Sequence, residues 1–206
     1  MTEDEFDGNL ANVGTICYEA HGNLYLNITN RCSASCVFCI RDGSDGVYGY
    51  DLRLKKEPSV GDILEKLESM DLDKYREVVF TGFGEATLRL DVVLEVTRWL
   101  KGRGVKVRID TNGHAQLLYP ERNVVAELKE AGVDEVSVSL NAESKSKYDE
   151  ICRPAYEGSY DAMLNFTRDA IAAGIQTRMT VVGFNDIDIE KCEKIAKDIG
   201  AAFHVR

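Results

Sequence analysis

The sequence lacks the features of three broad classes of protein. No apolar run reaches the roughly 18 residues that a membrane-spanning helix needs, and the acidic start Met1–Glu5 has no apolar core of the kind found in secretory signals. Positive charge is also scarce, because 25 Lys and Arg residues against 35 Asp and Glu residues give a net charge of −10. A surface this acidic repels phosphate backbones, which argues against direct nucleic-acid binding. We therefore expect a cytoplasmic protein with no membrane partner.

The chain length predicts one domain. Its 206 residues fit a single domain of ordinary size, and 44% hydrophobic with 29% charged residues is a normal globular composition. We expect a tail over 1–22, frayed over its first dozen residues and with an edge strand near 15–18, followed by one domain over 23–206. No appended domain is expected, so the substrate should be small or delivered by a partner protein.

Strand and helix patterns alternate from residue 24 onwards. Six strand patterns cover 24–29, 77–81, 105–110, 136–140, 176–182 and 202–205. Helical patterns cover 60–70, 92–100, 124–131, 160–173 and 189–199, with Ser59 and Ser159 as the expected N-caps of the first and fourth. This alternation predicts an α/β fold with parallel strands and outer helices. Because six units are too few for a closed eight-stranded barrel, we expect a partial (β/α)6 TIM-like open barrel.

Polar side chains fall on one face of most strands, although a parallel strand buried on both faces should be continuously apolar. We expect this face to line the barrel lumen, either as a ligand site or as an internal network of ion pairs and hydroxyls. It carries three arginines, at Arg108, Arg178 and Arg206, with Asp110 as the one expected strand acid. The arginines favour an anionic substrate group such as a carboxylate or phosphate, unless they pair with Asp110.

Three of the six cysteines form a compact motif. Cys32, Cys36 and Cys39 have the spacing Cys-x3-Cys-x2-Cys directly after the first strand, where a barrel places its active site. Without a secretory signal these thiols should be reduced, and clustered reduced thiols indicate a metal. Three local ligands favour an iron–sulfur cluster with one iron open to a non-protein ligand. Zinc with Cys17 or His21 as fourth ligand, and simple bystander thiols, remain alternatives.

The motif resembles the signature of the radical S-adenosylmethionine (radical SAM) enzymes. Phe38 precedes the last cysteine as in that family, and residues 24–32 resemble its first strand. The resemblance is closest to the small radical SAM proteins associated with TatD-family nucleases. It is more distant to glycyl-radical activating enzymes and carboxy-deazaguanine synthases.

The resemblance implies a [4Fe–4S] cluster held by Cys32, Cys36 and Cys39, with S-adenosylmethionine on the unique iron. Reductive cleavage of S-adenosylmethionine would give a 5′-deoxyadenosyl radical, which abstracts hydrogen from an unidentified substrate. An electron donor of the flavodoxin or ferredoxin type is implied, and a TatD-family nuclease is the candidate partner.

The resemblance also implies residues that bind S-adenosylmethionine, each at the end of a strand or in the loop after it. Gly82-Phe83-Gly84-Glu85 resembles the family's glycine-rich segment for the methionine amino group, although Phe83 replaces a glycine and Ala86 a proline. The remaining positions are Phe38 beside the cluster, Asn112 at the pocket border, Ser139 and Asn141 for the ribose, Arg153 (with Lys145 behind it) for the carboxylate, and Val182 and Gly183 for the adenine.

Two other functions fit parts of the pattern. An activase that installs a glycyl radical on a protein fits the open barrel, but its glycine-rich segment is only partly matched. A non-catalytic, zinc-stabilised interaction protein fits the acidic surface. Of the remaining cysteines, we expect Cys192 and Cys17 to be structural and Cys152 to be a hydrogen donor or a substrate contact. No sequence signal positions His114 or His204.

Overall fold

The computed structural model describes residues 13–183 and 186–206, so the expected frayed start lies outside the described residues. The chain falls into two compact units. Among the described residues, unit 1 comprises the chain from Val13 to Cys32 together with Ile40–Val107, and unit 2 comprises Ser33–Cys39 together with the residues from Arg108 onwards. The division into a tail over 1–22 and one domain over 23–206 stays a prediction. No helix among the described residues is long and apolar enough to cross a membrane.

Unit 1 is built on three neighbouring strands. β1 (Cys17–Ala20) runs antiparallel to β2 (Asn23–Asn27), and β2 runs parallel to β5 (Val78–Thr81). The helices of the unit are α1 (Ile40–Gly43), α2 (Val60–Glu68), η3 (Leu72–Lys74), η4 (Ala86–Arg89) and α3 (Leu90–Lys101), and a short hairpin pairs β3 (Gly46–Val47) with β4 (Tyr50–Asp51). The sequence had not indicated the hairpin or α1.

The start of α2 confirms one predicted N-cap. The side chain of Ser59 accepts a hydrogen bond from the backbone N–H of Asp62, and the Asp62 carboxylate accepts one from the N–H of Ser59 at 2.7 Å. This reciprocal capping box satisfies two donors that a helix start leaves without partners. Ile63 and Leu67 then fall on the buried face of the helix.

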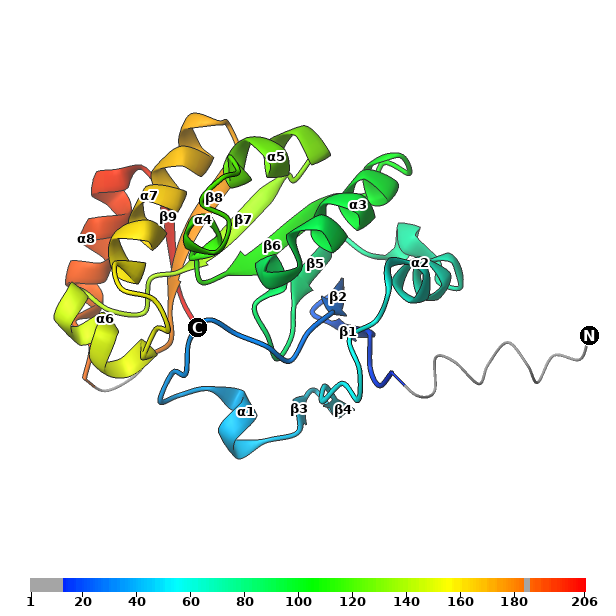
Figure 1. The fold of residues 1–206 in the computed structure, drawn as a ribbon, viewed down its shortest axis with the longest axis horizontal. Coiled ribbons are helices and arrows are strands. Elements are labelled where there is room, and N and C mark those ends of the chain that lie inside the picture. The colour runs from blue at the N-terminus through cyan, green and yellow to red at the C-terminus, as the bar shows by residue number, and fades with distance from the viewer. Residues whose placement is uncertain (1–12, 184–185) are drawn as a thin grey trace, which may run out of the picture. The chain divides into compact units, whose positions relative to one another are not determined.

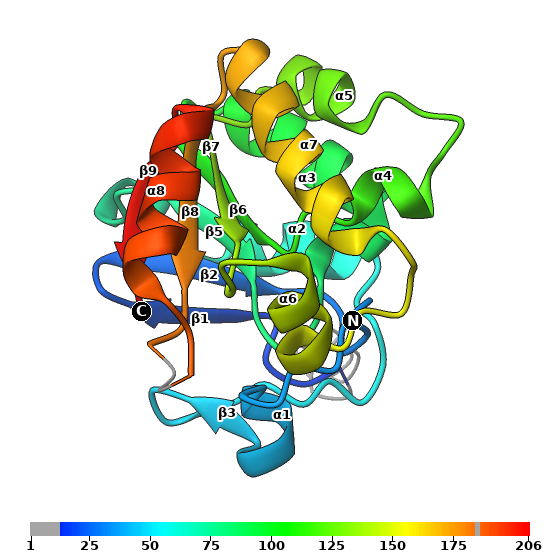
Figure 2. The same cartoon turned by 90° about the vertical axis from the view of Figure 1, so that its left-hand side faces the viewer.

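Unit 2 continues the alternation of strands and helices. Its strands β6 (Val107–Thr111), β7 (Glu135–Ser139), β8 (Gln176–Val181) and β9 (Ala202–Val205) follow one another in space and are all parallel. Its helices are α4 (Ala115–Leu118), α5 (Val124–Ala131), α6 (Lys145–Cys152), α7 (Ser159–Ala172) and α8 (Ile189–Ile199). Figures 1 and 2 show α5, α7 and α8 on one face of these strands. The predicted α/β class with parallel strands and outer helices is confirmed.

In unit 2 the expected N-cap of α7 was wrong, and one helix was not expected. Gly158, with φ of 76°, occupies the N-cap of α7, whereas Ser159 is the first helical residue and donates its hydroxyl to the carbonyl of Tyr156 at 2.8 Å. A glycine adopts this left-handed conformation without steric cost, which is why it replaces the expected serine. Helix α6 was not predicted at all, although Ser144 provides a side-chain N-cap for it.

The strand register of unit 2 arranges the polar face in layers. Arg108 pairs with Glu135 in the lowest layer, and Asp110, Ser137 and Arg178 are register partners in the next. The third layer, nearest the carboxyl ends, holds Ser139, Thr180 and His204. The intervening strand residues face the helices, and the apolar ones of β7 and β8 are fully buried: Val136, Val138, Met179 and Val181.

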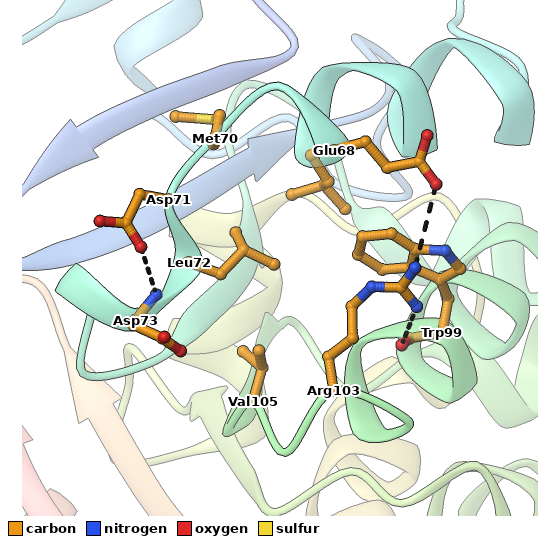
Figure 3. Close-up of a pocket in the computed structure, with 9 residues that line it drawn as sticks. Glu68, Met70, Asp71, Leu72, Asp73, Trp99, Arg103 and Val105 are labelled. Carbon is orange, nitrogen blue, oxygen red and sulfur yellow. Dashed lines mark hydrogen bonds and ion pairs between the residues drawn. The ribbon is translucent and has the colours of Figure 1, made fainter.

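A cavity of about 450 Å³ in unit 1 lies away from the predicted site. Leu72 and Val105 line it, and they precede β5 and β6 respectively, so the cavity lies at the amino ends of the strands. Arg103 also lines it, and its guanidinium lies 3.5 Å from the centre of the Trp99 ring and 3.9 Å from the Glu68 carboxylate (Figure 3). Because barrel active sites occupy the opposite ends of the strands, we do not assign this cavity to the site.

Candidate active site

The cysteine motif lies in the loop after β2. Cys32, Cys36 and Cys39 are each half-buried, and the backbone N–H of Cys39 donates to the carbonyl of Cys36 at 3.0 Å, which makes a tight turn. No disulfide joins any of the six cysteines, all of which the structure describes. Within residues 13–183 and 186–206, no three Cys, His, Asp or Glu side chains are gathered into a metal site. The three thiols nevertheless supply the donor chemistry that an iron–sulfur cluster requires.

An ion-pair network anchors the first part of this loop within unit 1. The carboxylate of Glu57 accepts two hydrogen bonds from Arg31, at 2.7 and 2.9 Å, and one from the hydroxyl of Thr29. Arg89 lies 3.5 Å from the same carboxylate and also donates to the carbonyl of Ile28 at 2.8 Å. Burial raises the pKa of Glu57, but the hydrogen bonds and the charges of the two arginines outweigh this and lower it. Sequence reasoning missed Glu57, because no local motif marks it.

The carboxamide of Asn30 adds a second anchor. It donates to the carbonyl of Leu54 at 2.7 Å and accepts from the N–H of the same residue at 3.1 Å. Arg41 donates to the carbonyl of Asn30 at 3.0 Å. The chain is therefore held at each of the three residues that lead into Cys32.

The glycine-rich segment presses directly against the start of the cysteine loop. A Cβ atom added at Gly84 would lie 2.4 Å from the carbonyl oxygens of both Thr29 and Arg31. The backbone N–H of Glu85 donates to the Arg31 carbonyl at 2.8 Å. Glycine is required at position 84 by this close approach of two backbones. The sequence interpretation had attributed this requirement to a ligand.

Asn27 connects the same segment to the rest of unit 1. Its Nδ2 donates to the carbonyls of Thr15 and Leu52, at 2.9 and 2.7 Å, and its Oδ1 accepts from the N–H of Phe83 at 3.2 Å. A Cβ at Gly82, whose φ is 113°, would lie 2.3 Å from this Oδ1. Asn27 is fully buried with its polar atoms bonded to backbone, so it is a structural residue rather than a ligand of the lumen.

The side chain of Glu85 is buried at the start of η4. Its Oε1 accepts from the backbone N–H of Thr87 at 3.1 Å and from the hydroxyl of Thr87 at 2.7 Å. Only 4% of the residue is exposed. This carboxylate therefore caps η4, and a role toward a methionine amino group has to accommodate that bond.

Helix α6 holds the second part of the cysteine loop within unit 2. The N–H of Ser35 donates to the carbonyl of Cys152 at 3.1 Å, and the N–H of Val37 donates to that of Ile151 at 2.8 Å. The N–H of Ala155 donates back to the carbonyl of Ser33 at 2.9 Å. These bonds place the backbone of Cys36 beside the last turn of α6.

Cys152 is consequently a neighbour of the motif. Its thiol is hydrogen-bonded to that of Cys36, and this bond together with burial raises the pKa of the Cys152 thiol. The Nδ2 of Asn141 lies 3.8 Å from the Cys152 sulfur. The sequence placed Cys152 on the active-site side but could not show which thiol it contacts.

Asn141 combines an unusual backbone conformation with a buried polar atom that has no partner among the described residues. Its φ is 56°, in the left-handed region that asparagine tolerates better than most residues. Its Oδ1 is buried without a hydrogen-bond partner among the described residues, and so is the Oγ1 of Thr180 on β8. Ser139 of β7 is the register partner of Thr180, and its hydroxyl accepts a hydrogen bond from the guanidinium of Arg206 at 3.1 Å. Buried acceptors without partners are costly, so a bound molecule that donates to Asn141 would be stabilised.

The arginines of the polar face are largely paired. Arg108 forms an ion pair with Asp110, and Arg178 forms one with Glu135 at 3.2 Å. Burial raises the pKa of the Asp110 carboxyl, while the arginine charges oppose this shift. The expectation of a single strand acid was wrong, because β7 begins one residue earlier than predicted and Glu135 belongs to the same face.

The other predicted positions all belong to unit 2. The Nδ2 of Asn112 donates a hydrogen bond to the hydroxyl of Ser33 at 2.8 Å. Arg153 is exposed and ends α6 with a φ of 46°. Its carbonyl accepts from the N–H of Ser35 at 3.2 Å. Phe38 is half-buried in the cysteine loop. Val182 and Gly183 follow β8, and the N–H of Gly183 donates to the carbonyl of Arg206 at 3.0 Å.

Comparison with known proteins identifies the family. A profile of the radical SAM superfamily matches residues 26–199. The chain belongs to the radical SAM superfamily. Enzymes of this superfamily use a [4Fe–4S] cluster and S-adenosylmethionine, and they need an electron donor.

Several curated relatives have the name GTP 3′,8-cyclase. The probable cyclase of Pyrococcus horikoshii is 34% identical over 127 residues, which are 61% of this chain and 36% of that protein. The cyclase of Lactiplantibacillus plantarum is 34% identical over 137 residues, or 65% of this chain and 37% of that protein. This radical SAM chain thus spans less than half the length of both relatives.

Solved structures show that the fold is that of radical SAM enzymes. Streptococcus suis SuiB bound to its precursor peptide SuiA has a TM-score of 0.68 at 16% identity, covering 89% of this chain and 38% of SuiB. A radical SAM methyltransferase from Sphaerobacter thermophilus has a TM-score of 0.64 at 15% identity, covering 92% of this chain and 57% of that enzyme. The predicted partial barrel is confirmed by this likeness.

Proposed function

We propose that this radical SAM protein holds a [4Fe–4S] cluster with Cys32, Cys36 and Cys39 and uses it to cleave S-adenosylmethionine. The observation that carries the proposal is the Cys-x3-Cys-x2-Cys loop, anchored at its start by Glu57 and farther along by α6. When bound, the reduced cluster supplies the electron that converts S-adenosylmethionine to methionine and a 5′-deoxyadenosyl radical, which abstracts a substrate hydrogen.

The chain's own residues would bind and orient S-adenosylmethionine. Asn141 offers a buried acceptor for a ribose hydroxyl, and Ser139 lies beside it with a hydroxyl. We assign the remaining predicted positions to the same molecule: Phe38, Gly82, Phe83, Gly84, Glu85, Asn112, Arg153, Val182 and Gly183. For Gly82 and Gly84 the contribution is indirect, because Gly82 lets the segment pack against Asn27 of β2 and Gly84 lets it pack against the start of the cysteine loop.

A nucleotide-derived substrate is the favoured substrate class. The relatives named GTP 3′,8-cyclase support it, and Arg206 on the polar face offers an anion contact beside Ser139. Arg108, Asp110 and Arg178 would act as a charged floor under that substrate, since their strongest contacts are ion pairs within the barrel. A flavodoxin or ferredoxin as electron donor and a cytoplasmic location belong to the same proposal. The same proposal includes the closer resemblance to the radical SAM proteins associated with TatD-family nucleases, and such a nuclease as the partner.

The test is anaerobic reconstitution with iron and sulfide, followed by a strong reductant and S-adenosylmethionine. We expect a brown protein that produces 5′-deoxyadenosine. Cys36→Ala should abolish the product, and Cys192→Ala, which removes a buried thiol from α8, should retain it. A colourless protein that binds one zinc ion and resists reconstitution would contradict the proposal and favour the zinc-stabilised interaction protein.

A further inference from the structure

His114 is a buried histidine whose two ring nitrogens are both hydrogen-bonded. Nδ1 lies 3.1 Å from the hydroxyl oxygen of Ser33, and Nε2 lies 2.7 Å from that of Tyr148. No part of the residue is exposed, and burial lowers its pKa to about 4. The ring is therefore neutral near pH 7, with one nitrogen donating and the other accepting.

The Nδ1 side of this contact reaches the cysteine loop. Ser33 directly follows Cys32 and is 3% exposed. Its hydroxyl also accepts from Nδ2 of Asn112 at 2.8 Å, while Oδ1 of Asn112 accepts from the backbone N–H of His114 at 3.1 Å. The short turn after β6 thus holds Ser33 through two side chains.

The Nε2 side reaches the helix on which the loop rests. Tyr148 lies in α6, is 1% exposed, and packs against Tyr160 of α7 with 5.4 Å between ring centres. The last turn of α6 accepts the backbone hydrogen bonds of Ser35 and Val37. His114 therefore bonds both to the loop and to the helix that supports the loop.

We propose that His114 is a positioning residue that fixes the conformation of the cysteine loop through Ser33. A buried, neutral ring suits this role because one tautomer sets the direction of both hydroxyl contacts at once. The Ser33 contact should matter more for the loop than the Tyr148 contact, because the loop retains its backbone bonds to α6 when Tyr148 is released. The inference rests on the proposed function only in that the loop is taken to hold the [4Fe–4S] cluster.

Two substitutions separate the two contacts. The amide of asparagine can replace Nδ1, and the longer amide of glutamine can replace Nε2, so His114→Asn keeps the Ser33 bond and His114→Gln keeps the Tyr148 bond. Amide hydrogen exchange of the full chain, measured by mass spectrometry with and without reconstitution, reports on the loop directly. We expect the amides of Ser35 and Val37 to exchange about fivefold faster in His114→Gln, the factor for losing one typical hydrogen bond. In His114→Asn they should stay within about twofold of the wild type.

Exchange within α3 of unit 1 provides the internal control. Equal acceleration of the loop in both variants, or matching acceleration in α3, would show a merely structural role and overturn the proposal. So would a loop that exchanges at the wild-type rate in His114→Gln. Ser33→Ala removes the same contact from the other side, together with the bond from Asn112, and serves as the test if His114→Gln fails to fold. Tyr148→Phe should behave like His114→Asn. Because the cluster-free protein gives this readout, a wild type that makes no 5′-deoxyadenosine would refute the proposed function and leave this result standing.

Discussion

Gly84→Ala tests whether the glycine-rich segment is shaped by packing against the cysteine loop. The new Cβ would lie 2.4 Å from the carbonyl oxygens of Thr29 and Arg31, whereas carbon–oxygen contacts normally begin at about 3.3 Å. Both carbonyls, or the segment itself, would have to move by roughly 1 Å. The substitution adds only a methyl group, and Gly84 does not have a left-handed φ, so the effect is purely steric.

The expected loss follows from two contributions. Overpacking of a tight contact costs about 1–3 kcal/mol, and weakening the bond from Glu85 N–H to the Arg31 carbonyl costs about 1 kcal/mol more. A total of about 2–4 kcal/mol is a large part of a typical stability of about 5–15 kcal/mol, but it leaves the protein folded. For a chain of this size the urea midpoint should fall by about 1–2 M.

Urea unfolding of the cluster-free protein, followed by circular dichroism, measures this shift. The matched control is Gly43→Ala in α1, where an added Cβ meets nothing within 4 Å. The control should unfold at or slightly above the wild-type midpoint, because alanine only reduces the freedom of the unfolded chain. Reconstituted Gly84→Ala should also lose iron to a chelator faster than the control. Equal midpoints for the two variants would refute the packing argument.

Three further predictions concern single side chains. Asn27→Ala should destabilise the protein by about 3 kcal/mol, because it leaves three backbone groups without their partner; exposed Asn165→Ala should change the urea midpoint little. Asn141→Gly should weaken S-adenosylmethionine binding about five- to tenfold in calorimetry without straining a φ of 56°; unchanged affinity would remove Asn141 from the site. The free energy of unfolding should fall by about 2 kcal/mol from pH 7 to pH 5. In the unfolded chain His114 takes up a proton as the pH falls below its ordinary pKa of 6.5, whereas the native ring, with a pKa of about 4, stays neutral. Urea titrations of His114→Asn at both pH values should lack that loss.

Periodic patterns predicted the elements well. Helices α5 and α8 begin and end where the apolar spacing indicated, and Gly200 closes α8 in the left-handed conformation. The alternation of polar residues on β6 to β8 also predicted one polar face. These properties depend on residues close in sequence, so a single sequence contains them.

Contacts between distant residues were harder to predict. Glu57 meets Arg31 across 26 positions, and the pair Arg178–Glu135 depends on the register between β7 and β8. The proximity of Cys152 to Cys36 depends on α6, which has only three buried side chains and therefore a weak apolar pattern. A signal for α6 was nevertheless present, because Ser144 precedes it as a typical N-cap.

The layered polar face of unit 2 separates two kinds of polar side chain. The two lower layers contain the ion pairs Arg108–Asp110 and Arg178–Glu135, and separating these largely buried charges would cost free energy. The upper layer holds small polar side chains instead, and there the hydroxyl of Thr180 has no partner among the described residues. A ligand bound there, as we propose, would supply hydrogen bonds to that hydroxyl and to the Oδ1 of Asn141. We therefore expect the proposed ligand recognition at the carboxyl ends of these strands to depend on hydroxyl and amide groups, above a floor of ion pairs.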